Sequence, residues 1–152
     1  MKAFKRKVFV SAMACFMACL MFAMPVMAAS TNYFSKTTPK LNAINGNISR
    51  IASLSSGSVS GTERSITQVS LYLNVSSGSD PFDVHIVSPE GYEYVFTPST
   101  TSKTYNITYF NGEDPKGTWS VYIENQGFSY NPNQIYPAST ATATLKVTYS
   151  YK

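Results

Sequence analysis

The feature that most constrains the fold is a strict alternation of apolar and polar side chains that begins at the only tryptophan. The alternation sets Trp119, Val121 and Ile123 on one face and Ser120, Tyr122 and Glu124 on the other. A period of two residues is that of a β-strand with one buried face. The preceding residues include Asn111-Gly112 and Pro115-Lys116-Gly117, which are typical of turns. We therefore expect a half-buried strand from Thr118, with Trp119 as its first inward residue.

Similar alternation recurs along the chain, separated by turn residues at short intervals. The segments expected to form strands are 66–75, 82–87, 92–97, 104–110 and 139–152, with a weak hairpin over 41–54. In the first of these, Thr67, Val69, Leu71, Leu73 and Val75 are expected to share the inward face. Residues 127–137 show no strand period and are expected to form a long loop. Seven or eight short strands predict an all-β fold, an antiparallel β-sandwich of jelly-roll type.

The N-terminal residues have the features of a secretory signal peptide. Four basic residues precede an apolar run over 8–24, and small residues follow Pro25 up to Ala28 and Ala29, where cleavage is expected. We therefore expect a signal peptide over 1–29, a flexible lead-in over 30–40, for which an edge strand is the alternative, and a single sandwich domain over 41–152. The protein is expected to be secreted and extracellular.

Removal of the signal peptide leaves a domain without net charge. Four of the 12 basic residues lie in the signal, so eight remain against eight acidic residues. A neutral domain gives no reason to expect a nucleic-acid or membrane partner. Cys15 and Cys19 also lie in the signal, which leaves neither a disulfide nor a thiolate metal site in the mature chain. We expect a monomer.

Three segments, in the same order along the chain, resemble the P domain of kexin- and furin-type proprotein convertases and of bacterial subtilisin-like proteases. They are VSLYLNV (69–75), FDVHIVSPEG (82–91) and FNGEDPKGTWSVYIEN (110–125), and LKVTYSY (145–151) is similar to the last strand of that family. The resemblance covers roughly residues 66–151 and implies a jelly-roll-like sandwich. In the family this module accompanies a protease domain and supports its folding and calcium dependence. We expect no protease domain in this chain, so the family's activity does not carry over.

Calcium is the one cofactor that the sequence suggests. The acids at the positions that match the family are Asp83, Glu113 and Asp114. Calcium takes six to eight oxygen ligands, which turns can supply as carboxylates and carbonyls together. The chain has no contiguous calcium-binding loop. Two interpretations stay open: the acids bind calcium, or they stay solvated in turns.

Catalytic chemistry is poorly supported by the residues. His85 is the only histidine, it lies in the middle of an expected strand on the outward face, and no G-x-S-x-G motif accompanies it. One histidine without cysteine also argues against zinc. The paired acids lie in turns or at outward strand positions, where solvated carboxylates are normal. We expect a protein that is not an enzyme and has no catalytic residues.

Exposed aromatic residues are the strongest candidates for a binding surface. Tyr92 and Tyr94 are expected on one face of a strand, and Phe128, Tyr130 and Tyr136 share the long loop with several amides. Flat rings beside amides suit carbohydrate or protein surfaces. Alternatively, the loop rings fold back over the sandwich. The expected function is a secreted binding module for cell-surface polysaccharide. A protein partner, such as a separate secreted protease, is the alternative, and a small hydrolase is third.

Overall fold

A computed structural model describes residues 28–152, and the expected signal peptide lies almost wholly outside this range. The described chain is an antiparallel β-sandwich, which confirms the fold class predicted from the sequence. It contains nine strands rather than seven or eight. They are β1 (Ser30–Thr37), β2 (Leu41–Ile44), β3 (Ala52–Ser55), β4 (Ser65–Val75), β5 (Phe82–Val87), β6 (Glu93–Phe96), β7 (Lys103–Ile107), β8 (Thr118–Asn125) and β9 (Ala138–Tyr151). Within residues 28–152, no helix is long and apolar enough to cross a membrane.

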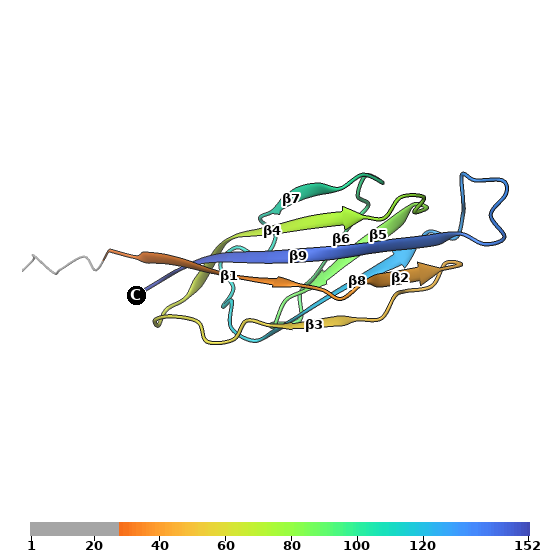
Figure 1. The fold of residues 1–152 in the computed structure, drawn as a ribbon. Coiled ribbons are helices and arrows are strands. Elements are labelled where there is room, and N and C mark those ends of the chain that lie inside the picture. Colours follow the sequence, from red (N-terminus) through yellow and green to blue (C-terminus); the bar gives the residue numbers. More distant parts are fainter. Residues whose placement is uncertain (1–27) are drawn as a thin grey trace, which may run out of the picture.

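The strands form two layers (Figure 1). One sheet has the order β1-β9-β4-β7, with β2 also pairing with β9, and the other has the order β3-β8-β5-β6. The long strand β9 therefore pairs with three others, in agreement with the extended alternation predicted over residues 139–152. The loop between β8 and β9 extends past the ends of the strands, at the right of Figure 1.

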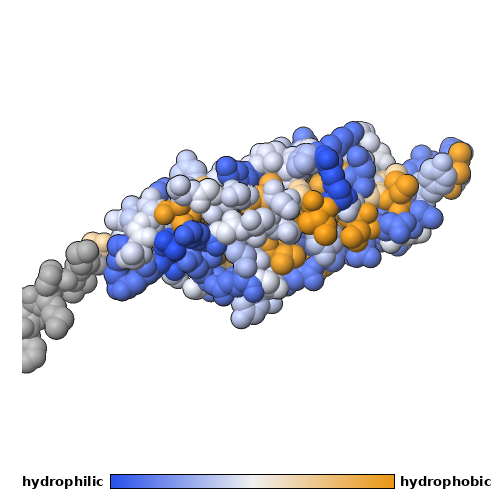
Figure 2. Space-filling view, turned by 90° about the horizontal axis from the view of Figure 1, so that it is seen from below, coloured by the Kyte–Doolittle hydropathy of each residue, from blue (hydrophilic) through white to orange (hydrophobic). Residues whose placement is uncertain are grey.

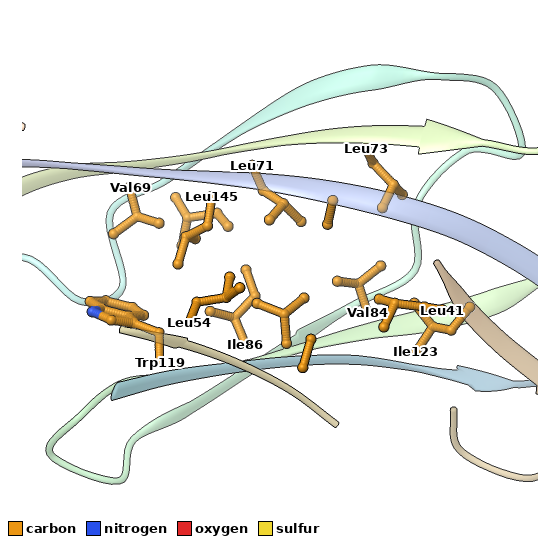
Figure 3. Packing of buried hydrophobic residues seen from close by; sticks show 14 of the residues in the cluster. Leu41, Leu54, Val69, Leu71, Leu73, Val84, Ile86, Trp119, Ile123 and Leu145 are labelled. Atoms are coloured by element: carbon orange, nitrogen blue, oxygen red, sulfur yellow. The ribbon is translucent and has the colours of Figure 1, made fainter. Parts of the chain in front are cut away.

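The core lies between the two sheets and consists of the inward residues of each strand (Figure 3). Val69, Leu71, Leu73 and Leu145 from one sheet face Leu54, Val84, Ile86, Trp119 and Ile123 from the other. Trp119 is fully buried, and its indole Nε1 donates a hydrogen bond to the carbonyl oxygen of Pro115 at 3.2 Å. The Phe110 ring meets it edge to face, with ring centres 5.2 Å apart. The turn before β8 is thus held against the core by Trp119, the first inward residue of the strand.

Gly117 shows why this turn requires glycine. Its φ is +135°, a conformation that residues with a side chain rarely adopt. A Cβ atom at this position would also lie 2.7 Å from the Cβ of Pro89, closer than two carbon atoms can pack. Glycine therefore lets the turn before β8 lie directly against the turn after β5.

Three details differ from the sequence-based predictions. Residues 30–37, expected to belong to a flexible lead-in, form β1 and pair with β9 over their whole length. The predicted hairpin over 41–54 is wrong, because β2 pairs with β9 and β3 pairs with β8, so this segment crosses between the sheets. Thr67 points outward, since a bulge between Ile66 and Gln68 shifts the phase of β4.

Candidate functional site

The loop over residues 126–137 exposes its large apolar side chains. The exposed fractions are 45% for Phe128, 78% for Tyr130, 88% for Ile135 and 57% for Tyr136. The Phe128 and Tyr130 rings contact each other edge to face, with centres 5.5 Å apart. The rings therefore do not fold back over the sandwich, which was the alternative considered from the sequence. The segment contains no charged residue.

A buried aspartate, Asp80, holds this loop in place. Its carboxylate accepts hydrogen bonds from the Ser129 hydroxyl at 2.6 Å, the Gln134 amide at 3.0 Å and the backbone N–H of Ala138 at 2.8 Å. The residue is 4% exposed, so these bonds are shielded from water. Because Gln134 points inward to Asp80, its amide is part of the loop's support rather than of the exposed surface. The alternation pattern gave no sign of this role, since Asp80 lies in a turn just before β5.

A second buried polar side chain joins the loop to the connection between β2 and β3. The Asn125 side-chain oxygen accepts hydrogen bonds from the backbone N–H groups of Gly46 at 3.0 Å and Gly127 at 2.9 Å. Its amide donates to the Ser139 hydroxyl at 2.8 Å. The connection also exposes Ile44 by 53% and Ile48 by 51% of their surface.

These residues form one surface, which we call the apolar end. It comprises Ile44, Ile48, Phe128, Tyr130, Ile135 and Tyr136. Figure 2 shows that most of the hydrophobic surface on the face in view lies in the half of the molecule that carries the loop. Exposed apolar side chains that gather at one end of a folded domain mark a candidate site of interaction.

The other two predicted aromatic residues lie elsewhere. Tyr94 is half-buried and packs against Phe96, Tyr109 and Phe110, so its ring is part of the core boundary. Tyr92 is 54% exposed and lines a pocket of about 380 Å³. The pocket lies beyond the last residue of β5, whereas Asp80 and the loop lie before its first residue. The predicted aromatic residues are therefore divided between the two ends of the sandwich.

The three predicted calcium ligands are not brought together. Asp83, near the start of β5, accepts hydrogen bonds from the Thr97 hydroxyl and from the Gln126 amide. Asp114 accepts hydrogen bonds from Arg64 at 3.0 Å and 2.9 Å, and this guanidinium holds the pKa of the carboxyl below its usual range. In residues 28–152 no group of three or more His, Cys, Asp or Glu side chains could hold a metal ion. Calcium binding stays a prediction.

Glu113, the third of these acids, lies in the pocket beyond β5. Burial raises the pKa of its carboxyl, and the nearby charge of Glu90 raises it further, while the Ser88 hydroxyl opposes the shift. Ser88 lies beside the carboxylate without reaching hydrogen-bond geometry, and Glu113 Oε2 is buried without a hydrogen-bond partner. The pocket thus contains a carboxylate with one oxygen that lacks a well-formed hydrogen bond within the domain.

His85 belongs to a polar cluster that the sequence did not reveal. Its ring stacks on Tyr122 with centres 4.4 Å apart, and its Nδ1 lies 2.9 Å from the Glu93 carboxylate. Nε2 lies 3.3 Å from Glu124, at ion-pair distance but without hydrogen-bond geometry. The Tyr122 hydroxyl donates to Glu93 at 2.6 Å. The cluster joins β5, β6 and β8 on the outer face of their sheet, and it depends on strand register that local sequence does not specify.

The cluster has a clear effect on the ionisation of its members. Burial and then the hydrogen bond to Glu93 raise the pKa of Tyr122 to about 12. The hydrogen bonds from Tyr122 and His85 lower the pKa of Glu93 below its ordinary value of 4.5. At neutral pH Glu93 is therefore ionised and Tyr122 keeps its proton.

Replacing Glu93 by glutamine is expected to lower stability by about 1 kcal/mol at pH 7, because a neutral amide oxygen accepts weaker hydrogen bonds from Tyr122 and His85 than the carboxylate does. The lowered pKa means that this stabilisation is present above pH 4.5 and is lost as pH falls through the folded-state pKa of Glu93. Urea unfolding at pH 7 and pH 3 measures the difference. Glu63→Gln is the control, since Glu63 pairs with Lys152 on the exposed surface, where water screens the charges. If Glu93→Gln lowered the free energy of unfolding by the same amount at pH 7 and pH 3, the ionised Glu93 carboxylate would not be the source of the stabilisation.

Comparison with known proteins gives similarity of fold only. No protein-family model and no curated protein matches the sequence. A serine protease of Aeromonas sobria matches 85% of this chain with 12% identity and a TM-score of 0.55, and the chain covers 28% of that protein. The structure of FLHE matches 80% of this chain with 16% identity and a TM-score of 0.51, and 97% of that chain is covered. The first match agrees, at the level of fold, with the P-domain-like sandwich expected from the sequence.

Proposed function

We propose that this protein is a secreted, non-catalytic binding module that docks on a partner protein through its apolar end. The observation that carries the proposal is the loop over 126–137, which exposes four large apolar side chains while Asp80 accepts hydrogen bonds from its Ser129 and Gln134 side chains. A rigid surface loses little conformational freedom on binding, so more of the contact energy remains as affinity. Aromatic residues are enriched, and charged residues depleted, in the centres of protein interfaces.

The composition of the surface favours a protein over a polysaccharide. Ile135 is 88% exposed, and Ile44 and Ile48 extend the same apolar surface beyond the loop. Branched aliphatic side chains suit a hydrophobic protein contact, whereas sugars are held by ring stacking and hydrogen bonds. The similarity to part of a serine protease supports an accessory role beside such an enzyme, encoded separately.

A cell-surface polysaccharide is the second candidate. Tyr130 and Tyr136 keep 78% and 57% of their surface exposed, so each ring is available for stacking on a sugar. Both candidates use the same loop, and they differ in the residues required. A sugar would depend on the two tyrosines, whereas a protein would also depend on Ile135.

In the test, residues 30–152, the expected mature domain, are immobilised on a solid support. The support is then incubated with medium from the producing cells. One secreted protein is expected to bind, and the double change Tyr130→Ser with Ile135→Ser is expected to reduce its capture about tenfold or more, as for residues central to an interface. Tyr72→Ser is the matched control, since Tyr72 is 47% exposed on a different surface.

Equal capture by the wild type and the double variant would contradict the proposal. The domain could instead sediment with insoluble polysaccharide. If this binding required Tyr130 and Tyr136 but tolerated Ile135→Ser, it would establish polysaccharide as the ligand. Both assays are run in EDTA and in millimolar calcium. Binding or thermal stability that rises with calcium would support the expectation that the domain binds calcium.

A further inference from the structure

The pocket beyond β5 combines aromatic walls with negative charge. Its volume is about 380 Å³, and its lining consists of Glu90, Tyr92, Tyr109, Asn111, Gly112 and Glu113. Tyr92 and Tyr109 are 54% and 55% exposed. Nothing in the apolar end uses this pocket, which lies at the opposite end of the sandwich.

The aromatic wall is held in position by its neighbours. The Tyr109 ring meets the Phe110 ring nearly at a right angle, with centres 5.3 Å apart, and Phe110 is fully buried. Tyr94 lies on another side of Tyr109, with ring centres 5.5 Å apart. Tyr109 is therefore anchored to the core while half of its surface faces solvent.

The arginine beside the pocket pairs with a residue outside its lining. Arg64 binds Asp114 through two hydrogen bonds, so it offsets Asp114 rather than the two glutamates. Glu90 Oε1 accepts a hydrogen bond from the backbone N–H of Asp114 at 3.0 Å, which fixes this carboxylate at the pocket. Glu113 Oε2 is buried without a hydrogen bond of good geometry, and the Ser88 hydroxyl beside it only partly offsets the raised pKa of this carboxyl, so its charge is weakly compensated within the domain.

We propose that this pocket binds the basic side chain of a lysine or arginine in a peptide segment. An ammonium or guanidinium group is attracted to the face of a tyrosine ring and to carboxylates at once. Calcium fits the lining less well, because it needs six to eight oxygen ligands and gains nothing from aromatic walls.

The position of the pocket favours a peptide over a free amine. Tyr92 directly precedes β6, which is the edge strand of its sheet. An edge strand offers unpaired backbone groups to which an extended peptide can add. A peptide that pairs with β6 would carry a side chain to the pocket at the start of that strand.

The test titrates the domain (residues 30–152) with the blocked tripeptide Ala-Lys-Ala and with its Arg and Gln counterparts, and follows the backbone amides of Asn111 and Gly112 by NMR. The Lys and Arg peptides are expected to give saturable shifts that weaken with salt, and the Gln peptide none. Tyr92→Leu is expected to weaken binding about threefold through loss of the cation–π contact. Glu90→Gln is expected to weaken it about tenfold through loss of the charge.

The two variants change exposed groups, and glutamine keeps an acceptor for the Asp114 N–H, so both are expected to fold. Glu63→Gln, an acid outside the pocket, is the control and is expected to bind as the wild type does. Equal shifts with the Gln peptide, or unchanged affinity in Glu90→Gln, would overturn the proposal. Glucosamine that binds as tightly as the Lys peptide would overturn the assignment to a peptide. These outcomes leave the apolar end untouched, so either site can fail without the other.

Discussion

Replacing Trp119 by alanine is expected to destabilise the domain by about 3–5 kcal/mol, the usual cost of removing a buried aromatic side chain. Trp119 is fully buried between the two sheets, contacts Phe110 and hydrogen-bonds to the Pro115 carbonyl. The change leaves a cavity and also frees the turn that precedes β8. Because a domain of this size has a free energy of unfolding of about 5–15 kcal/mol, much of its stability would be lost.

Urea unfolding followed by circular dichroism measures this effect. Trp119→Phe is the matched variant, since it keeps an aromatic ring in the cavity and loses the hydrogen bond, and a smaller loss is expected. Tyr72→Ala removes an exposed ring from β4 and is expected to change stability little. A loss below about 1 kcal/mol for Trp119→Ala would show that the tryptophan is not packed as described.

Replacing Asp80 by alanine is expected to have two effects: a loss of about 2–3 kcal/mol of stability and a loosened loop over 126–137. Three hydrogen bonds end on this carboxylate, from Ser129, Gln134 and Ala138. Two of them come from the loop itself, and the third comes from the first residue of β9. Without the acceptor, the loop side chains turn to solvent and the Ala138 N–H loses its side-chain acceptor.

Hydrogen exchange of the amides in residues 127–137, together with urea unfolding, measures both effects. The amide exchange rates in this loop are expected to increase by more than the loss in the free energy of unfolding alone would cause. Asp114→Ala is the control, because Asp114 accepts its hydrogen bonds from Arg64 at the opposite end of the sandwich. Loop exchange that is unchanged in Asp80→Ala would mean that other contacts hold the loop.

The strands with a clear apolar alternation could be predicted from the sequence. The inward phases of β5, β8 and β9 follow directly from it, as in Trp119, Val121 and Ile123. β1 could be considered only as an alternative to a flexible lead-in, because its side chains are mostly exposed and its stability comes from backbone pairing with β9. The hairpin expected over 41–54 was wrong for a related reason: local turn residues at Asn45-Gly46 do not specify which distant strands β2 and β3 join.

The candidate sites were predictable only in part. The exposure of Phe128, Tyr130 and Tyr136 was one of two alternatives that the sequence left open, the other being that the rings fold back over the sandwich. The supporting role of Asp80 and the stacking of His85 on Tyr122 were not, because each depends on residues brought together by strand register. The grouping of Tyr92 with Glu113 in one pocket likewise follows from the packing of the two turns beyond β5.

The central claim is that the apolar end is the binding surface, and a hydrogen-exchange footprint tests it most directly. The domain is compared free and bound to the secreted protein that it captures. Protection is expected in residues 44–48 and 126–137, and little change is expected on the outer face around Tyr122 and His85. Protection confined to other surfaces, with unchanged exchange in 126–137, would contradict the claim.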